Sequence, residues 1–110
     1  MEKFVKGDVV IVPFPFSDLS QYKKRPALII TSLRGDDVVL CQITSQALDD
    51  EYSVVIKSSD FETGSLQQIS NARPNRIFTA DSNIILYKAG NLKQSKTIEI
   101  IDKLIELIKK

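Results

Sequence analysis

Two apolar, β-branched runs separated by a polar stretch most constrain how this chain can fold. Residues 9–12 read Val-Val-Ile-Val, and residues 26–30 read Pro-Ala-Leu-Ile-Ile. Branching at Cβ favours an extended backbone, so both runs are predicted to be β-strands. Residues 17–25 between them are mostly polar and are predicted to form a loop, because such a stretch cannot be core. A loop of this length on two rigid strands is a common location for binding or catalysis.

Further short apolar runs continue the pattern. Strands are predicted at residues 38–43, 52–57, 66–70, 77–80 and 84–87, with a turn at 89–91. Pro74 cannot donate to a central ladder of hydrogen bonds, so it is predicted to mark a strand edge or a break. Apolar residues then recur at helical spacing, at Ile98, Ile101, Leu104, Ile105 and Ile108. Six or seven short strands followed by one helix indicate a mainly β domain, a small barrel or sandwich, over residues 1–110.

The absence of histidine limits the chemistry of this chain. Histidine is the usual general acid or base, the usual metal ligand, and the partner of serine or cysteine nucleophiles. With no histidine and a single cysteine, Cys41, we expect no zinc site, and an internal disulfide is impossible. Cys41 falls in an apolar run and is predicted to be a buried thiol. An enzyme of this composition has to use Arg, Lys, Asp, Glu, Tyr, Thr or Ser.

The formal net charge of +1 argues against a protein that coats long nucleic acid by charge alone. It allows a pocket that binds two or three phosphates. No apolar run approaches the roughly 20 residues of a membrane span, and the N-terminal residues lack the apolar segment of a signal peptide. We therefore expect a cytoplasmic protein that needs no cofactor and no metal.

Arg25 and Thr44 are the strongest candidates for binding or catalysis. Arg25 precedes an apolar strand directly, and there its planar guanidinium can bind two phosphate oxygens. The alternative is a solvated arginine, or a surface ion pair with Asp18. Thr44 and Ser45 end the predicted third strand, where their hydroxyls can hydrogen-bond a phosphate or merely satisfy a turn.

The stretch K-G-D-V-V-x-V-x-F-P-F-S-D-L-S, followed by a short basic segment and R-P-A-L-I-I, resembles the opening of the MazF/PemK/Kid family. Members of that family are toxin endoribonucleases of type II toxin–antitoxin pairs. The resemblance implies an SH3-like barrel with a C-terminal helix, a homodimer, and an acidic antitoxin as partner. It also implies metal-independent cleavage of single-stranded RNA, with the substrate 2′-hydroxyl as nucleophile. Residues implicated in cleavage in the family correspond to Arg25 and Thr44.

Other positions are candidate substrate contacts. Some family members place an arginine and, two residues later, an aspartate in the active site, where this chain has Arg73 and Asn75. Asparagine cannot take a proton as a carboxylate can, so no general base is assigned. An exposed Phe16 would be able to stack on an RNA base. The predicted substrate-binding residues are Phe16, Ser17, Lys24, Ser45, Arg73 and Asn75.

Two other functions remain open from the sequence. The CcdB-like DNA gyrase poisons share the barrel that the resemblance implies, and a catalytically inactive binding module would need no catalytic residue. Residues 105–110 lack the aromatic tip that we expect of a gyrase poison. RNA cleavage that disappears in Arg25→Ala would distinguish the endoribonuclease from both alternatives.

Overall fold

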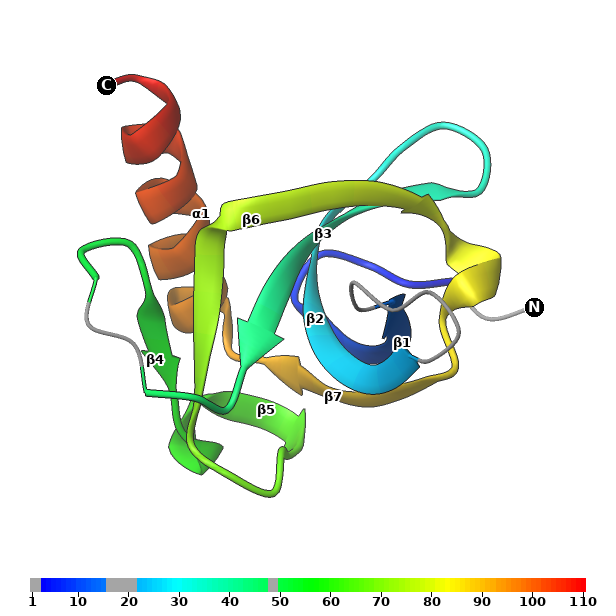
Figure 1. The fold of residues 1–110 in the computed structure, drawn as a ribbon, viewed down its shortest axis with the longest axis horizontal. Helices are drawn as coiled ribbons and strands as arrows, with labels where there is room; N and C mark the ends of the chain where they lie inside the picture. The colour runs from blue at the N-terminus through cyan, green and yellow to red at the C-terminus, as the bar shows by residue number, and fades with distance from the viewer. Residues whose placement is uncertain (1–2, 16–21, 48–49) are drawn as a thin grey trace.

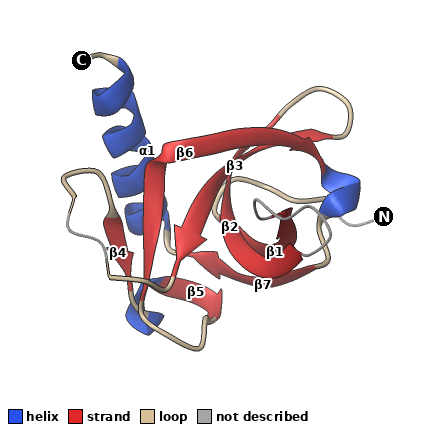
Figure 2. Cartoon of the chain, viewed as in Figure 1, coloured by secondary structure: helices blue, strands red, loops and turns tan. Residues whose placement is uncertain are grey.

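The computed structural model describes residues 3–15, 22–47 and 50–110. Its elements are β1 (Asp8–Pro15), β2 (Tyr22–Ser32), β3 (Asp37–Thr44), β4 (Val54–Ile56), β5 (Phe61–Gly64), β6 (Ser70–Asp81), β7 (Tyr87–Leu92) and α1 (Gln94–Ile108). The strands form one antiparallel sheet in the order β4-β6-β3-β2-β1-β7-β5. This sheet curls into a half-barrel with α1 beside it (Figures 1 and 2). The predicted mainly β, barrel-like fold with a C-terminal helix is confirmed.

The sheet carries a hydrophobic core on each face, because successive residues of a strand point to opposite sides. The core on the α1 face includes Val9, Leu28 and Cys41. The core on the other face includes their neighbours Val10, Ile29 and Leu40. Since β1, β2 and β3 are buried on both faces, each reads as a continuous apolar run rather than an alternating one.

Helix α1 packs on the sheet with only part of the predicted apolar stripe. Its buried residues are Thr97, Ile100 and Leu104. Ile98, Ile105 and Ile108 are 48%, 45% and 68% exposed, so the predicted buried face was partly wrong. The helix carries two adjacent apolar stripes, and its contacts with β4 and β6 decide which one is covered. Among the described residues no helix has the length and apolarity to cross a lipid bilayer.

The strands near the sheet edges differ most from the prediction. β5 was expected to be part of a loop, and the strand predicted at residues 66–70 begins only at residue 70. The strand predicted at 84–87 begins only at residue 87, after a 3-10 helix at Ser82–Ile84. An apolar run alone did not decide these boundaries, since residues 84–86 are apolar yet precede β7, whereas β5 contains a single apolar residue, Phe61. Pairing with other strands defines where these strands begin and end.

Residues 89–91 lie inside β7 rather than in the predicted turn. Gly90 of β7 pairs with Gly64 of β5. A Cβ atom added to Gly90 would lie 2.5 Å from the carbonyl oxygen of Thr63, which is too close for any side chain. The glycine therefore permits the close approach of two strands.

β6 replaces the predicted break at Pro74 with a bulge. Arg73 lies opposite Gln42 of β3, whereas Ile77 lies opposite Cys41. The three residues between Arg73 and Ile77 therefore have no partner in β3, although the strand continues through them. A bulge is one of the few places where a sheet tolerates proline, because the missing N–H is not needed there.

Asp8, from the K-G-D stretch, is a fully buried carboxylate that joins the N-terminal segment to β7. Its Oδ2 accepts the backbone N–H of Val5 at 2.9 Å, and its Oδ1 accepts Nδ2 of Asn91 at 2.9 Å. Lys88 Nζ lies 3.2 Å from Oδ1 and supplies the opposite charge. A buried carboxylate with this set of partners is a structural group.

Candidate functional site

Arg25 and Thr44 lie at the same end of two neighbouring strands. Arg25 is a residue of β2, which begins at Tyr22, and not the end of a loop as predicted. Ala27 of β2 pairs with Gln42 of β3. This is the last pair of the ladder between β2 and β3. Side chains two residues apart in a strand share a face, so Arg25 lies on the face of Ala27 and Thr44 on the face of Gln42, which is the same side of the sheet.

The next strand, β6, extends this group. Its Arg73 pairs with Gln42, and its Asn71 pairs with Thr44. Neighbouring strands are about 4.8 Å apart, so one extended phosphodiester segment can meet side chains of all three. Further along the same face the core residues Ala27 and Leu40 are completely buried, so the face changes from apolar to polar at this end. We call this group the polar cluster: Arg25, Gln42, Thr44, Asn71 and Arg73.

The polar cluster is largely withdrawn from solvent. Thr44 is 5% exposed and Asn71 is 9% exposed, while the two arginines are half-buried. The Nε of Arg73 is buried and has no hydrogen-bond partner within the described part of the chain. A buried donor without a partner costs free energy, and an anionic ligand can recover this cost.

A turn after β3 lies close to Arg73. The Oδ1 of Asp50 accepts the N–H groups of Ser53 at 2.8 Å and of Tyr52 at 3.0 Å. The N–H of Ser53 lowers the pKa of the Asp50 carboxyl, and the positive charge of Arg73 lowers it further. The cluster therefore has an ionised carboxylate in its neighbourhood at neutral pH.

Two hydrogen bonds link Thr44 and Asn71 through a third residue. Asn71 Nδ2 donates to the backbone carbonyl of Gln46 at 3.0 Å. The backbone N–H of Gln46 donates to Oγ1 of Thr44 at 3.2 Å. Thr44 and Asn71 are thus partners both in the ladder of strands and in the loop above it.

The other predicted site residues are not among the polar cluster. Lys24 is exposed and adjoins Arg25 within β2, so alternation directs it to the opposite side of the sheet. Ser45 is exposed and follows the end of β3, outside the strand. Asn75 is exposed and lies in the bulge of β6, without a partner in β3. Phe16 and Ser17 lie outside the described residues, as does Asp18.

Gln42 and Asn71 were not predicted as site residues. The signal for them was the period of two along the strands, because Gln42 and Thr44 share a face, as do Asn71 and Arg73. Only the pairing of β3 with β6 shows that these are the same face.

Cys41 is buried, as predicted. Burial raises the pKa of its thiol to about 12, although the backbone N–H of Arg73 partly opposes the rise. The thiol is therefore protonated at neutral pH and is a poor nucleophile.

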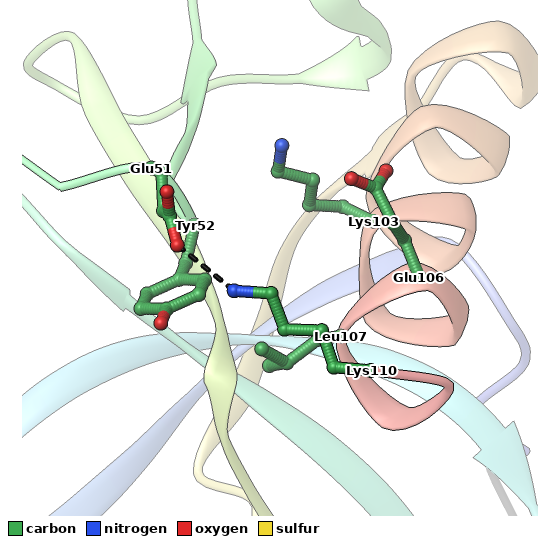
Figure 3. Close-up of a pocket in the computed structure, with 6 residues that line it drawn as sticks. All are labelled: Glu51, Tyr52, Lys103, Glu106, Leu107 and Lys110. Atoms are coloured by element: carbon green, nitrogen blue, oxygen red, sulfur yellow. Dashed lines mark hydrogen bonds and ion pairs between the residues drawn. The ribbon is translucent and has the colours of Figure 1, made fainter.

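The hollow drawn in Figure 3 lies at the C-terminal end of α1, against the turn that holds Glu51 and Tyr52, and its lining includes no residue of the polar cluster. Its volume is about 110 Å³, and its lining residues are Glu51, Tyr52, Lys103, Glu106, Leu107 and Lys110. Lys110 Nζ lies 2.9 Å from the Glu51 carboxylate and 5.3 Å from the centre of the Tyr52 ring. Lys110 and Glu51 therefore already have partners within the protein.

Residues 5–108 match the model of a family described as PemK-like, MazF-like toxin of type II toxin-antitoxin system. This chain belongs to that family. The match covers nearly the whole chain and confirms the resemblance that its first 45 residues carry. No curated protein sequence matches the chain significantly.

Solved structures share the fold of this PemK/MazF-like chain. An endoribonuclease from a Mycobacterial species, in complex with its cognate antitoxin, is 18% identical, with a TM-score of 0.76 over 97% of this chain and 96% of that one. MazF in the MazE-MazF complex (Form-III) of Deinococcus radiodurans is 15% identical, with a TM-score of 0.76 over 96% and 95%. The Mycobacterium tuberculosis toxin MazF-mt6 is 17% identical, with a TM-score of 0.68 over 91% and 96%. The prediction of an RNA-cleaving enzyme agrees with the name of the mycobacterial protein.

Proposed function

We propose that this PemK/MazF-like toxin is an endoribonuclease that cleaves single-stranded RNA at the polar cluster. The observation that carries the proposal is the pairing of β3 with β6, in which Gln42 lies opposite Arg73 and Thr44 opposite Asn71. Alternation along β2 adds Arg25 to the same face, since Ala27 pairs with Gln42. The buried Nε of Arg73 lacks a partner within the described residues, which supports an anionic ligand. A relative of the same fold that is named an endoribonuclease supports the reaction class.

In the proposed reaction the substrate supplies its own nucleophile. The 2′-oxygen attacks the adjacent phosphorus, the new P–O2′ bond forms, and the P–O5′ bond breaks. The 2′-hydroxyl loses its proton and the departing 5′-oxygen gains one, which leaves a 2′,3′-cyclic phosphate and a 5′-hydroxyl. This route requires neither a protein nucleophile nor a metal ion, and it suits a chain without histidine.

The cluster residues would stabilise the negative charge that develops on the phosphoryl oxygens. Arg25 would bind two oxygens with its guanidinium, and Thr44 would donate its hydroxyl to one. Such preorganised donors are each worth about 3 kcal/mol of transition-state stabilisation. Arg73 would hold the phosphate, while bases of the unpaired RNA strand would provide sequence preference. The group that removes the 2′-hydroxyl proton is not assigned.

The proposed partners are an acidic antitoxin and a second copy of the chain. A negatively charged peptide segment would compete with RNA phosphates for the arginines of the cluster.

The exposed stripe of Ile98, Ile105 and Ile108 on α1 supports a homodimer, because a second copy would cover it. Light scattering in solution should give the mass of two chains, and the mass of one chain would contradict the dimer. A toxin that cleaves cellular RNA acts in the cytoplasm.

The test is a cleavage assay on a long single-stranded RNA in EDTA. Wild type should cut at a repeated short sequence and leave 2′,3′-cyclic phosphate ends. Arg25→Ala and Thr44→Ala should each reduce cleavage by roughly 100-fold, the usual cost of losing one transition-state donor. Matched controls are Arg34→Ala and Thr79→Ala, two exposed residues that lie outside the polar cluster.

Each variant needs a thermal unfolding curve like that of wild type before its activity is interpreted. Intact RNA with the wild-type protein, or undiminished cleavage by Arg25→Ala, would overturn the proposal. DNA gyrase inhibition would then be the next activity to measure, because it is the alternative on the same barrel.

A further inference from the structure

The Thr44 hydroxyl is held in one hydrogen-bonding role by its surroundings. Its oxygen accepts the backbone N–H of Gln46 at 3.2 Å. Within the described residues no acceptor takes the proton of this hydroxyl. The bond from Gln46 uses one lone pair of this oxygen and leaves its proton available to a ligand. Threonine is also stiff at χ1, so the position of the hydroxyl oxygen is well defined.

The position of Gln46 depends in turn on Asn71. Gln46 itself is exposed and follows the end of β3, where no ladder partner holds its backbone. Asn71 Nδ2 donates to its carbonyl at 3.0 Å. Asn71 is 9% exposed and belongs to β6, where it pairs with Thr44 of β3 on one side and Val55 of β4 on the other. The side chain of Asn71, which is buried, therefore holds the backbone of Gln46 in place.

We infer that Asn71 is a positioning residue of this active site: it holds Gln46, and Gln46 orients the Thr44 hydroxyl as the donor to the scissile phosphate. The inference rests on the proposed function, because Asn71 acts only through Thr44. The amide is required chemically, since aspartate has nearly the same shape but its carboxylate cannot donate to a carbonyl.

The first test is a double-mutant cycle on the full-length protein, with Asn71→Asp and Thr44→Val. Thr44→Val keeps the volume of the side chain and removes the hydroxyl. Asn71→Asp alone should lower kcat roughly 10-fold, as expected for a residue that orients a catalytic group, and change KM by less than about twofold. In the Thr44→Val background the same substitution should have no further effect on kcat.

A pH profile supplies a readout that a purely structural role would not move. When the carboxyl introduced by Asn71→Asp takes up a proton at low pH, it can again donate to the Gln46 carbonyl. The ratio of its kcat to that of wild type should therefore rise as pH falls through the pKa of this carboxyl. The matched control is Asn83→Asp. Asn83 is exposed and lies in the 3-10 helix that follows β6. The ratio of the kcat of this variant to that of wild type should not change with pH.

The outcomes separate the two levels of the proposal. Wild type that leaves RNA intact overturns the proposed function and this inference with it. Wild type that cleaves, with an Asn71→Asp defect that persists in the Thr44→Val background, leaves the function standing and overturns the inference. Should Asn71→Asp unfold below the assay temperature, the neutral Asn71→Ser takes its place, and its defect must likewise vanish when the hydroxyl of Thr44 is absent.

Discussion

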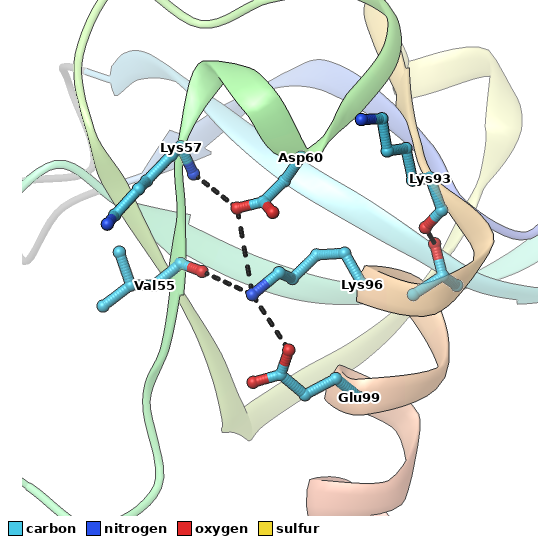
Figure 4. A network of polar contacts seen from close by, with 7 residues as sticks. Val55, Lys57, Asp60, Lys93, Lys96 and Glu99 are labelled. Carbon is cyan, nitrogen blue, oxygen red and sulfur yellow. Dashed lines mark hydrogen bonds and ion pairs between the residues drawn. The ribbon is translucent and has the colours of Figure 1, made fainter.

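The polar cluster and the helix side of the molecule use polar residues in opposite ways. On the helix side, Lys96 and Lys110 lie at or near the surface and form ion pairs with neighbouring carboxylates (Figures 3 and 4). In the polar cluster, side chains are half-buried or buried, and the Nε of Arg73 has no partner among the described residues. The first arrangement completes its interactions within the protein, whereas the second leaves hydrogen-bonding capacity for a ligand.

Lys96 shows the helix-side arrangement most clearly. Its Nζ lies 2.9 Å from Glu99 Oε1, 3.2 Å from the Val55 carbonyl and 3.8 Å from Asp60 Oδ2 (Figure 4). The same carboxylate oxygen of Asp60 accepts the N–H of Lys57 at 2.8 Å. Lys96 thereby joins α1 to the backbone of the edge strand β4 and covers a carbonyl that would otherwise be open to pairing.

The comparison explains why we place the proposed site in the polar cluster and not in the surface hollow. The hollow of Figure 3 holds a completed ion pair between Lys110 and Glu51. The cluster is recognised by unmet hydrogen bonding at a place where an apolar sheet face becomes polar. Three substitutions test this distinction.

The largest effect is expected for Arg73→Met, which tests whether the cluster is built for ligand binding. Methionine keeps most of the length of the side chain and removes every donor. RNA cleavage should fall by about 100-fold. The free energy of unfolding should not fall and should rise by up to about 1 kcal/mol, because a buried donor without a partner is removed. Chemical denaturation and the cleavage assay measure the two quantities on the same sample, and a loss of stability with intact cleavage would reverse the distinction.

An intermediate effect, of the opposite kind, is expected for Lys96→Met on the helix side. The aliphatic stem remains, but the ion pair with Glu99 and the bond to the Val55 carbonyl are lost. Urea unfolding should show a loss of about 2 kcal/mol, typical of hydrogen bonds to a charged group. Specific cleavage activity below the unfolding transition should match wild type, and a marked decrease would link this network to the active site.

The smallest effect is expected for Glu51→Gln. The hydrogen bond from Lys110 and its positive charge lower the pKa of the Glu51 carboxyl. A carboxyl with a lowered pKa in the folded state stabilises the protein above its unfolded pKa, and this contribution disappears as pH falls through the folded value. Because the pair is solvent-exposed, the change at pH 7 should be smaller than that of Lys96→Met. Melting curves from pH 7 down to pH 3 should converge for variant and wild type, and curves that diverge toward low pH would contradict this sign.

Local chemistry made the central strands predictable. The runs at residues 9–12, 26–30 and 38–43 lie within β1, β2 and β3, because β-branched residues favour an extended backbone without help from neighbours. The edge strand β5 and its neighbour β7 were misplaced, since they contain glycine and polar residues, and they form by pairing with each other and, for β7, with β1. For α1, likewise, the sequence alone does not tell which of its two apolar stripes is buried, because only the packing of the helix on the sheet distinguishes them.

By itself, the sequence determined a small mainly β domain with a C-terminal helix, the family to which it belongs, and Arg25, Thr44 and Arg73 as candidates. Only the tertiary structure decided which of the candidates meet. Asn71 and Gln42 enter the cluster, while Lys24 lies on the opposite face, Asn75 lies in the bulge and Ser45 follows the end of β3. The physical reason is register: a strand alternates its side chains by a local rule, but which residues of three distant segments lie side by side depends on the pairing of the whole sheet.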